Sequence, residues 1–97
     1  MSSYEEEILE LRKEINQLNA EIVNKLSERV NVALKIAEVK KKHGLPVVDK
    51  KREAKVLGQV QELASECKID PSGVKRVFRE IIRLCTEAEE KGEIQII

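Results

Sequence analysis

One uninterrupted helical segment constrains the fold of this chain more than any other feature. From Glu5 to His43 the sequence contains neither glycine nor proline, and its apolar residues recur at the spacing of one helix face. This apolar stripe consists of Ile8, Leu11, Ile15, Leu18, Ile22, Leu26, Ala33, Ile36 and Ala37. A helix of roughly 39 residues is about 58 Å long, whereas a compact domain of this size has a radius of gyration of only about 12–13 Å. The helix therefore extends beyond any core that the rest of the chain can supply.

Two shorter helices are predicted after the turn that contains Gly44 and Pro46. The three helices are expected over about residues 4–43, 50–67 and 71–91, and no role is assigned to the tail 93–97. Residues typical of helix ends set these bounds: Ser3, Asp49 and Asp70-Pro71 at the starts, Gly44 and Gly92 after the ends of the first and third helices.

The sequence thus predicts one all-α domain, residues 1–97, with three helices and a very long first helix. The stripe of that helix is apolar at both ends, so a second chain has to cover it. We expect an intertwined homodimer in which the long helices pack along each other.

The composition limits which kinds of partner the chain is expected to bind. The chain has 18 basic and 18 acidic residues and only two aromatic ones, which argues against binding nucleic acid or an anionic membrane. No stretch approaches the ~20 apolar residues of a membrane span, and the start lacks a basic-then-apolar leader, so a cytoplasmic protein is expected. Cys67, Cys85 and the single histidine, His43, are too few and too scattered for a zinc site, and free thiols are expected.

Two cations fall inside the apolar stripe. Arg29 and Lys40 project within about 30° of its middle and point the same way, about 16 Å apart along the axis. A charge out of water needs a counter-charge, so each requires an anion from the protein or from a ligand. Arg12, about 25 Å further along the helix, cannot reach the same ligand within one chain but can enter a partner's site.

A purely structural role is also open to several of these residues. Arg29 can form a structural ion pair with an acid such as Glu53, and Lys40 is near a helix end that favours cations. Asp49 is first a helix cap, and Glu89 can be the edge of the solvated face of the third helix. The clustering of several cations, two acids and a helix N-terminus favours a site for a small dianion with a hydroxyl group.

The sequence resembles the all-helical chorismate mutases over nearly its whole length. The matching residues are Leu11-Arg12, Ile15, Leu18, Ile22, Leu26, Glu28-Arg29, Ile36, Val39-Lys40, Gly44, Pro46-Val47, Asp49, Arg52-Glu53, Val77-Phe78 and Ile81-Ile82. The resemblance implies an intertwined dimer of three-helix chains that converts chorismate to prephenate in phenylalanine and tyrosine biosynthesis. It implies two active sites, each completed by an arginine from the other chain.

The resemblance also implies a role for each candidate. Arg12 of the partner chain, Arg29 and Arg52 would help to hold the two substrate carboxylates. Lys40 would bond the ether oxygen of the breaking C–O bond as well as a carboxylate. The ring hydroxyl would be bound by the backbone of Asp49 and by Glu53, between apolar walls formed by Ile36 and Ile82.

Two positions differ from the bacterial pattern. Cys85 stands where a serine often contacts a carboxylate. Glu89 stands where bacterial members have a glutamine that donates to the ether oxygen, whereas fungal relatives have a glutamate. Since a carboxylate cannot donate, Glu89 would have to be protonated. The reaction is a pericyclic rearrangement, so no metal, nucleophile or other cofactor is expected.

Two other functions fit the same sequence. An isochorismate pyruvate lyase on the same scaffold is similar around the cations of the first helix, although it lacks the Asp-x-x-Arg-Glu run at Asp49, Arg52 and Glu53. A non-enzymatic helical dimerisation module would use Arg29 and Lys40 in structural ion pairs.

Overall fold

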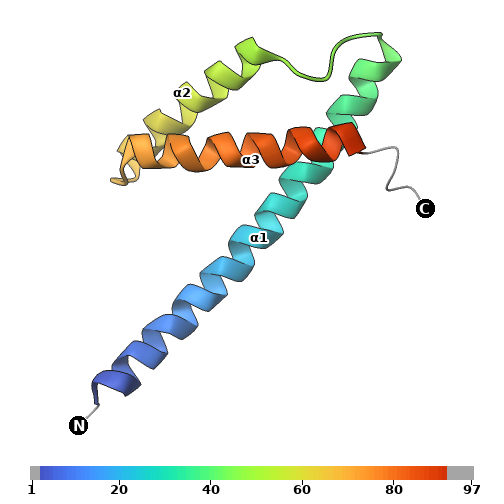
Figure 1. Cartoon of the computed structure of the whole chain (residues 1–97). Helices are drawn as coiled ribbons and strands as arrows, with labels where there is room; N and C mark the ends of the chain where they lie inside the picture. Colours follow the sequence, from blue (N-terminus) through green and yellow to red (C-terminus); the bar gives the residue numbers. More distant parts are fainter. Residues whose placement is uncertain (1–2, 92–97) are drawn as a thin grey trace.

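The computed structural model describes residues 3–91, which form three α-helices joined by two short connections (Figure 1). These are α1 (Tyr4–Lys42), α2 (Lys50–Glu66) and α3 (Pro71–Lys91). The prediction of an all-α chain with a very long first helix is confirmed. The first two helices end one residue before the expected positions, and the expected stop at Gly92 and the tail 93–97 lie outside the described residues.

Each helix begins where a side chain accepts hydrogen bonds from the first turn. The Ser3 hydroxyl accepts from the backbone N–H of Glu6 at 3.2 Å, and the Asp49 carboxylate accepts from that of Arg52 at 3.1 Å. The Asp70 carboxylate accepts from two N–H groups in the first turn of α3, at 3.2 and 3.1 Å. These bonds satisfy N–H groups that have no partner inside the helix, which fixes the starting residues.

The ends of α1 and α2 have the same backbone geometry. After α1, Gly44 adopts a φ of +67°, and the N–H of Leu45 reaches back to the carbonyl of Lys40 at 2.8 Å. After α2, Lys68 adopts a φ of +59°, and the N–H of Ile69 bonds the carbonyl of Ala64 at 3.0 Å. Both are left-handed caps of the Schellman type, which reverse the chain direction within a few residues.

The helices form an open arrangement. α3 packs against α2 and crosses the C-terminal half of α1, whereas the N-terminal half of α1 projects away from both (Figure 1). The radius of gyration is 17.8 Å and the principal extents are 65 × 36 × 14 Å. This radius exceeds the ~12–13 Å expected for a compact domain of this length, so one chain does not enclose a full core.

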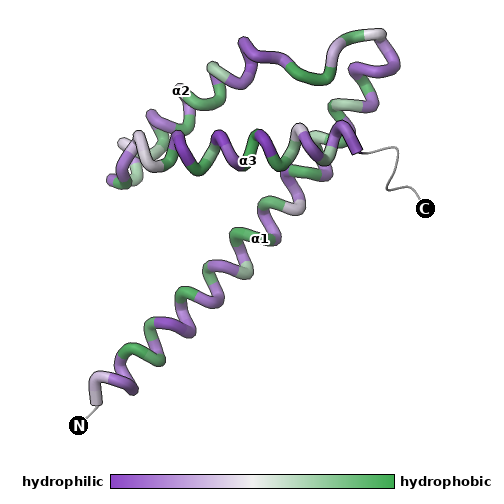
Figure 2. Tube along the Cα trace, viewed as in Figure 1, coloured by the Kyte–Doolittle hydropathy of each residue, from purple (hydrophilic) through white to green (hydrophobic). Residues whose placement is uncertain are grey.

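Burial confirms how little core there is. Within residues 3–91 the buried apolar residues are all small or medium-sized: Ala33, Ala37, Val60, Ala64 and Cys85. Four residues of the apolar stripe are each between 51% and 56% exposed: Leu11, Ile15, Leu18 and Ile22. Figure 2 shows apolar segments recurring along the N-terminal part of α1, which no other helix covers. No helix of the described part combines the length and the apolar composition needed to cross a membrane.

Candidate active site

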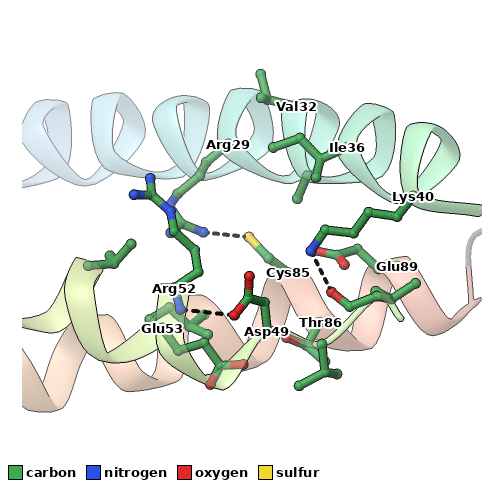
Figure 3. A pocket seen from close by; sticks show the side chains of 15 residues that line it. Arg29, Val32, Ile36, Lys40, Asp49, Arg52, Glu53, Cys85, Thr86 and Glu89 are labelled. Carbon is green, nitrogen blue, oxygen red and sulfur yellow. Dashed lines mark hydrogen bonds between the residues drawn. The ribbon is translucent and has the colours of Figure 1, made fainter. Parts of the chain in front are cut away.

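The C-terminal half of α1, the start of α2 and the C-terminal half of α3 enclose a cavity of about 270 Å³ (Figure 3). Since α1 and α2 do not pack directly on each other in the described part of the chain, the space between them stays open. Nine of the ten candidate residues line this cavity: Arg29, Ile36, Lys40, Asp49, Arg52, Glu53, Ile82, Cys85 and Glu89.

Lys40 lies in the last turn of α1 and is half-buried. Its ammonium group donates a hydrogen bond to the backbone carbonyl of Val47 at 2.9 Å. An ammonium group has three N–H donors, so two are left for a ligand. The contact orients the side chain into the cavity without neutralising its charge.

The side chain of Arg29 extends into the cavity from the side of α1 that faces α3. Its Nη1 donates to the sulfur of Cys85 at 3.0 Å, and Cys85 is only 3% exposed. Within the described residues, the alternative ion pair with Glu53 is not formed, and the Glu53 carboxylate pairs instead with Lys50, at 3.7 Å. Arg29 therefore keeps its positive charge available on the cavity side.

The cations of the cavity are not held in ion pairs within the described residues. Among residues 3–91, no carboxylate oxygen lies within 4.0 Å of a side-chain nitrogen of Arg29, Lys40 or Arg52. Three carboxylates line the same cavity, but none of them forms an ion pair with these cations, so N–H groups of the cations remain for an anionic ligand. This arrangement fits an anionic ligand better than a structural ion-pair network.

Asp49 and Glu53 place oxygen atoms on the α2 side of the cavity. The Asp49 carboxylate already accepts the N–H of Arg52, as expected for a cap. Asp49 lines the cavity, and its backbone N–H donates to no protein group within the described residues. Glu53 is half-buried, one turn along the helix. Together they offer a donor and an acceptor to a hydroxyl group.

Glu89 reaches the cavity from the last turns of α3. Burial raises the pKa of its carboxyl group above the ordinary value, while the positive charges of Lys40 and Arg29 lower that pKa in part. The negative charges of Glu53 and Glu90 act in the same direction as burial. The pKa is raised overall, so the protonated form, which can donate a hydrogen bond, persists to higher pH than in an ordinary glutamate.

Arg12 is the one candidate outside the cavity. It is exposed and lies on the part of α1 that projects away from α2 and α3, about 25 Å along the helix from Arg29. Its own chain cannot bring it to the cavity.

The cavity has further walls that the sequence pattern did not assign: Val32, Ala33, Val47, Val48, Val56 and Thr86. Three of these six residues could have been identified from helical spacing. Val32 lies one turn before Ile36, Val56 one turn after Arg52, and Thr86 one turn after Ile82. Val47 and Val48 belong to the connection between α1 and α2, where no periodicity applies.

Comparison with known proteins agrees with this geometry. A family model described as chorismate mutase type II matches residues 11–90. The chain is 35% identical over 92 residues to the bifunctional chorismate mutase/prephenate dehydratase of Aquifex aeolicus, covering 92% of this chain and 25% of that protein. It is 29% identical over 77 residues to the chorismate mutase of Methanocaldococcus jannaschii, covering 79% and 78%.

A solved structure is also similar. The chorismate mutase (form II) of Thermus thermophilus superposes with a TM-score of 0.82 at 31% identity, covering 89% of this chain and 97% of that one. The chain spans about a quarter of the length of the Aquifex relative, and most of the length of the Methanocaldococcus one. The match over residues 11–90 covers most of α1, all of α2, all but the last residue of α3 and every residue named at the cavity, and by this match the chain belongs to the chorismate mutase type II family.

Proposed function

We propose that this chain is a chorismate mutase, an isomerase that converts chorismate to prephenate. The observation that carries the proposal is the cavity in which Arg29, Lys40 and Arg52 have no carboxylate partner within the described residues. Chorismate has two carboxylates, a ring hydroxyl and an apolar ring. The cavity offers cations, polar groups on α2, and apolar walls for these parts.

The roles follow from the positions of the side chains. Arg29 and Arg52 hold the two carboxylates, which brings the ends of the forming C–C bond together. Lys40 donates to the ether oxygen, where negative charge grows as the C–O bond breaks. Protonated Glu89 donates to the same oxygen. Electrons move around one ring of six atoms, so the protein has only to orient the substrate and stabilise that charge.

The substrate hydroxyl and ring take the remaining positions. The backbone N–H of Asp49 and the carboxylate of Glu53 bind the hydroxyl, and Ile36 and Ile82 flank the ring. Val32, Val56 and Thr86 complete these walls.

The active unit of this proposal is an intertwined homodimer of single-domain chains. The exposed stripe of α1 supports it, because four large apolar residues in one row are costly to leave in water. In the dimer, Arg12 of one chain enters the cavity of the other and holds a carboxylate together with Arg29.

The test is an assay of the purified protein with chorismate and, separately, with isochorismate. We expect chorismate to disappear and prephenate to form in equal amounts. Pyruvate release from isochorismate without prephenate from chorismate would assign the lyase activity instead. If the folded protein converts neither compound, the remaining alternative is a non-enzymatic dimerisation module.

A further inference from the structure

Cys85 is buried in the core and also contacts Arg29, one of the cations of the cavity. Its sulfur is the acceptor for Nη1 of Arg29 at 3.0 Å, the one hydrogen bond that Arg29 makes within residues 3–91. Both residues line the cavity, and they come from different helices, α1 and α3. The contact therefore joins the two helices at the place where a substrate carboxylate would bind.

A buried sulfur at this distance restricts the guanidinium. Arginine has many rotamers, and holding it in one of them costs conformational entropy each time a ligand binds. Cys85 is held by the packing of α3 and is 3% exposed, so its sulfur is a fixed point. Because the guanidinium is planar, fixing one N–H sets the direction of the whole fork.

The chemistry of the acceptor matters as much as its position. Sulfur is a weak acceptor, so it orients Arg29 without competing strongly for its charge. The guanidinium has five N–H donors, and the bond to Cys85 uses one. Four remain for a carboxylate. An acid at position 85 would bind Arg29 more tightly and repel the substrate.

We propose that Cys85 is a positioning residue that acts through Arg29 and has no direct contact with the substrate. The inference rests on the proposed function, since it describes how the same cavity binds a carboxylate. It assigns the cysteine a different task from that of a serine that hydrogen-bonds the carboxylate itself.

The experiment compares two variants of nearly equal volume. Cys85→Ala removes the acceptor, whereas Cys85→Ser keeps an acceptor at the same place. We expect Cys85→Ala to raise KM for chorismate about three- to tenfold with less than a twofold change in kcat, since one hydrogen bond to a weak acceptor is lost and its effect is on binding. Cys85→Ser should restore KM to within about twofold of the wild type. Equal KM values for the two variants overturn the proposal.

A double-mutant cycle tests whether the effect passes through Arg29. The second substitution is Arg29→Lys, which keeps the charge but loses the planar fork. If Cys85 acts only through Arg29, Cys85→Ala should change KM little in the Arg29→Lys background, so the two effects are not additive. A full additional loss of affinity in that background would show direct substrate contact or general destabilisation, and would overturn the inference.

Folding and function are checked separately. Circular dichroism and thermal unfolding establish that each variant keeps its helices. If Cys85→Ala does not fold, Cys85→Val, which is larger and also lacks the acceptor, takes its place in the cycle. A wild-type protein without chorismate turnover overturns the proposed function and this inference together. An active wild type with additive variants overturns this inference alone.

Discussion

The ammonium group of Lys40 donates a hydrogen bond to the backbone carbonyl of Val47, 2.9 Å away, across the connection between α1 and α2. The same connection begins with the bond from Leu45 back to the carbonyl of Lys40. Lys40 is therefore fixed at both its backbone and its side chain. Its partners are uncharged, so the positive charge is held in place without being neutralised. This is the arrangement that electrostatic catalysis requires, because the charge needs no reorganisation during the reaction.

Replacing Lys40 with alanine should remove activity without unfolding the protein. In the proposed function Lys40 stabilises charge that develops in the transition state, and losing one such donor lowers kcat by about 10²–10³-fold. The measurements are kcat for chorismate and the helical circular dichroism signal. Lys35→Ala is the matched control, since Lys35 is an exposed lysine of α1 outside the cavity. A Lys40→Ala protein that loses helix content but keeps activity per folded molecule would favour the structural role.

Glu89 should make the activity depend on pH. Burial raises the pKa of Glu89, so the protonated donor persists to higher pH than in an ordinary glutamate. Activity should be full below this pKa and should fall as the pH rises through it. In the free protein Lys40 and Arg29 lower the pKa, and a bound dianion offsets both charges. The fall in kcat should therefore occur at higher pH than the fall in kcat/KM.

The variant Glu89→Gln tests this assignment, because glutamine donates at every pH. Its kcat profile should be flat across the range in which the wild type declines, and should exceed the wild type at the alkaline end. Glu87→Gln is the control, since Glu87 lies on α3 outside the cavity and pairs with Arg83 at 3.3 Å. An unchanged profile in Glu89→Gln would place the titrating group elsewhere.

Much of the fold and of the cavity could be predicted from the sequence, for local reasons. Helix starts depend on a side chain and an N–H three residues away, as at Ser3 and Asp49, and such pairs are visible in sequence. The 11-residue spacing of Arg29 and Lys40 is almost three full helical turns, so the sequence also shows that both side chains point in the same direction from α1.

The contacts that depend on tertiary structure could not be predicted. Nothing in the spacing indicates that Arg29 reaches Cys85, which is 56 positions away. The walls formed by Val47 and Val48 were missed because a connection has no periodicity. In the proposed dimer the position of Arg12 relative to the cavity is set by a second chain, and the sequence of one chain does not give that geometry.

Lys68 follows the end of α2 and has a left-handed backbone conformation, which favours glycine. Its φ of +59° is a conformation that costs a residue with a Cβ roughly 1–2 kcal/mol. Lys68→Gly should therefore stabilise the protein by about 1 kcal/mol, less the greater freedom of glycine in the unfolded chain. Urea or thermal unfolding measures the change. Gly44→Ala is the converse test, since Gly44 has a φ of +67° and no atom within 4 Å of an added Cβ. It should destabilise through backbone strain alone.

The exposed stripe of α1 should control oligomeric state. Ile22 is 56% exposed in one chain, and a charge placed there would be buried at the proposed dimer interface without a partner. Ile22→Asp should shift the mass in solution from dimer to monomer and lower activity with it. Asn24→Asp adds the same charge about 200° around the helix, and should leave both unchanged. A monomeric wild type by sedimentation or light scattering would contradict the dimer directly.

Mixed dimers should show whether Arg12 serves its own chain or the partner. Arg12→Ala and Lys40→Ala should each be nearly inactive alone. In a dimer of one chain of each kind, the cavity of the Arg12→Ala chain has an intact Lys40 and receives an intact Arg12 from the other chain. Random exchange makes about half of the dimers mixed, and each has one complete site of two, so roughly a quarter of wild-type activity should return. If Arg12 acts within its own chain, both cavities of the mixed dimer are defective, and mixing restores nothing. Unfolding and refolding the two variants together, with each refolded alone as the control, distinguishes these outcomes in one activity assay.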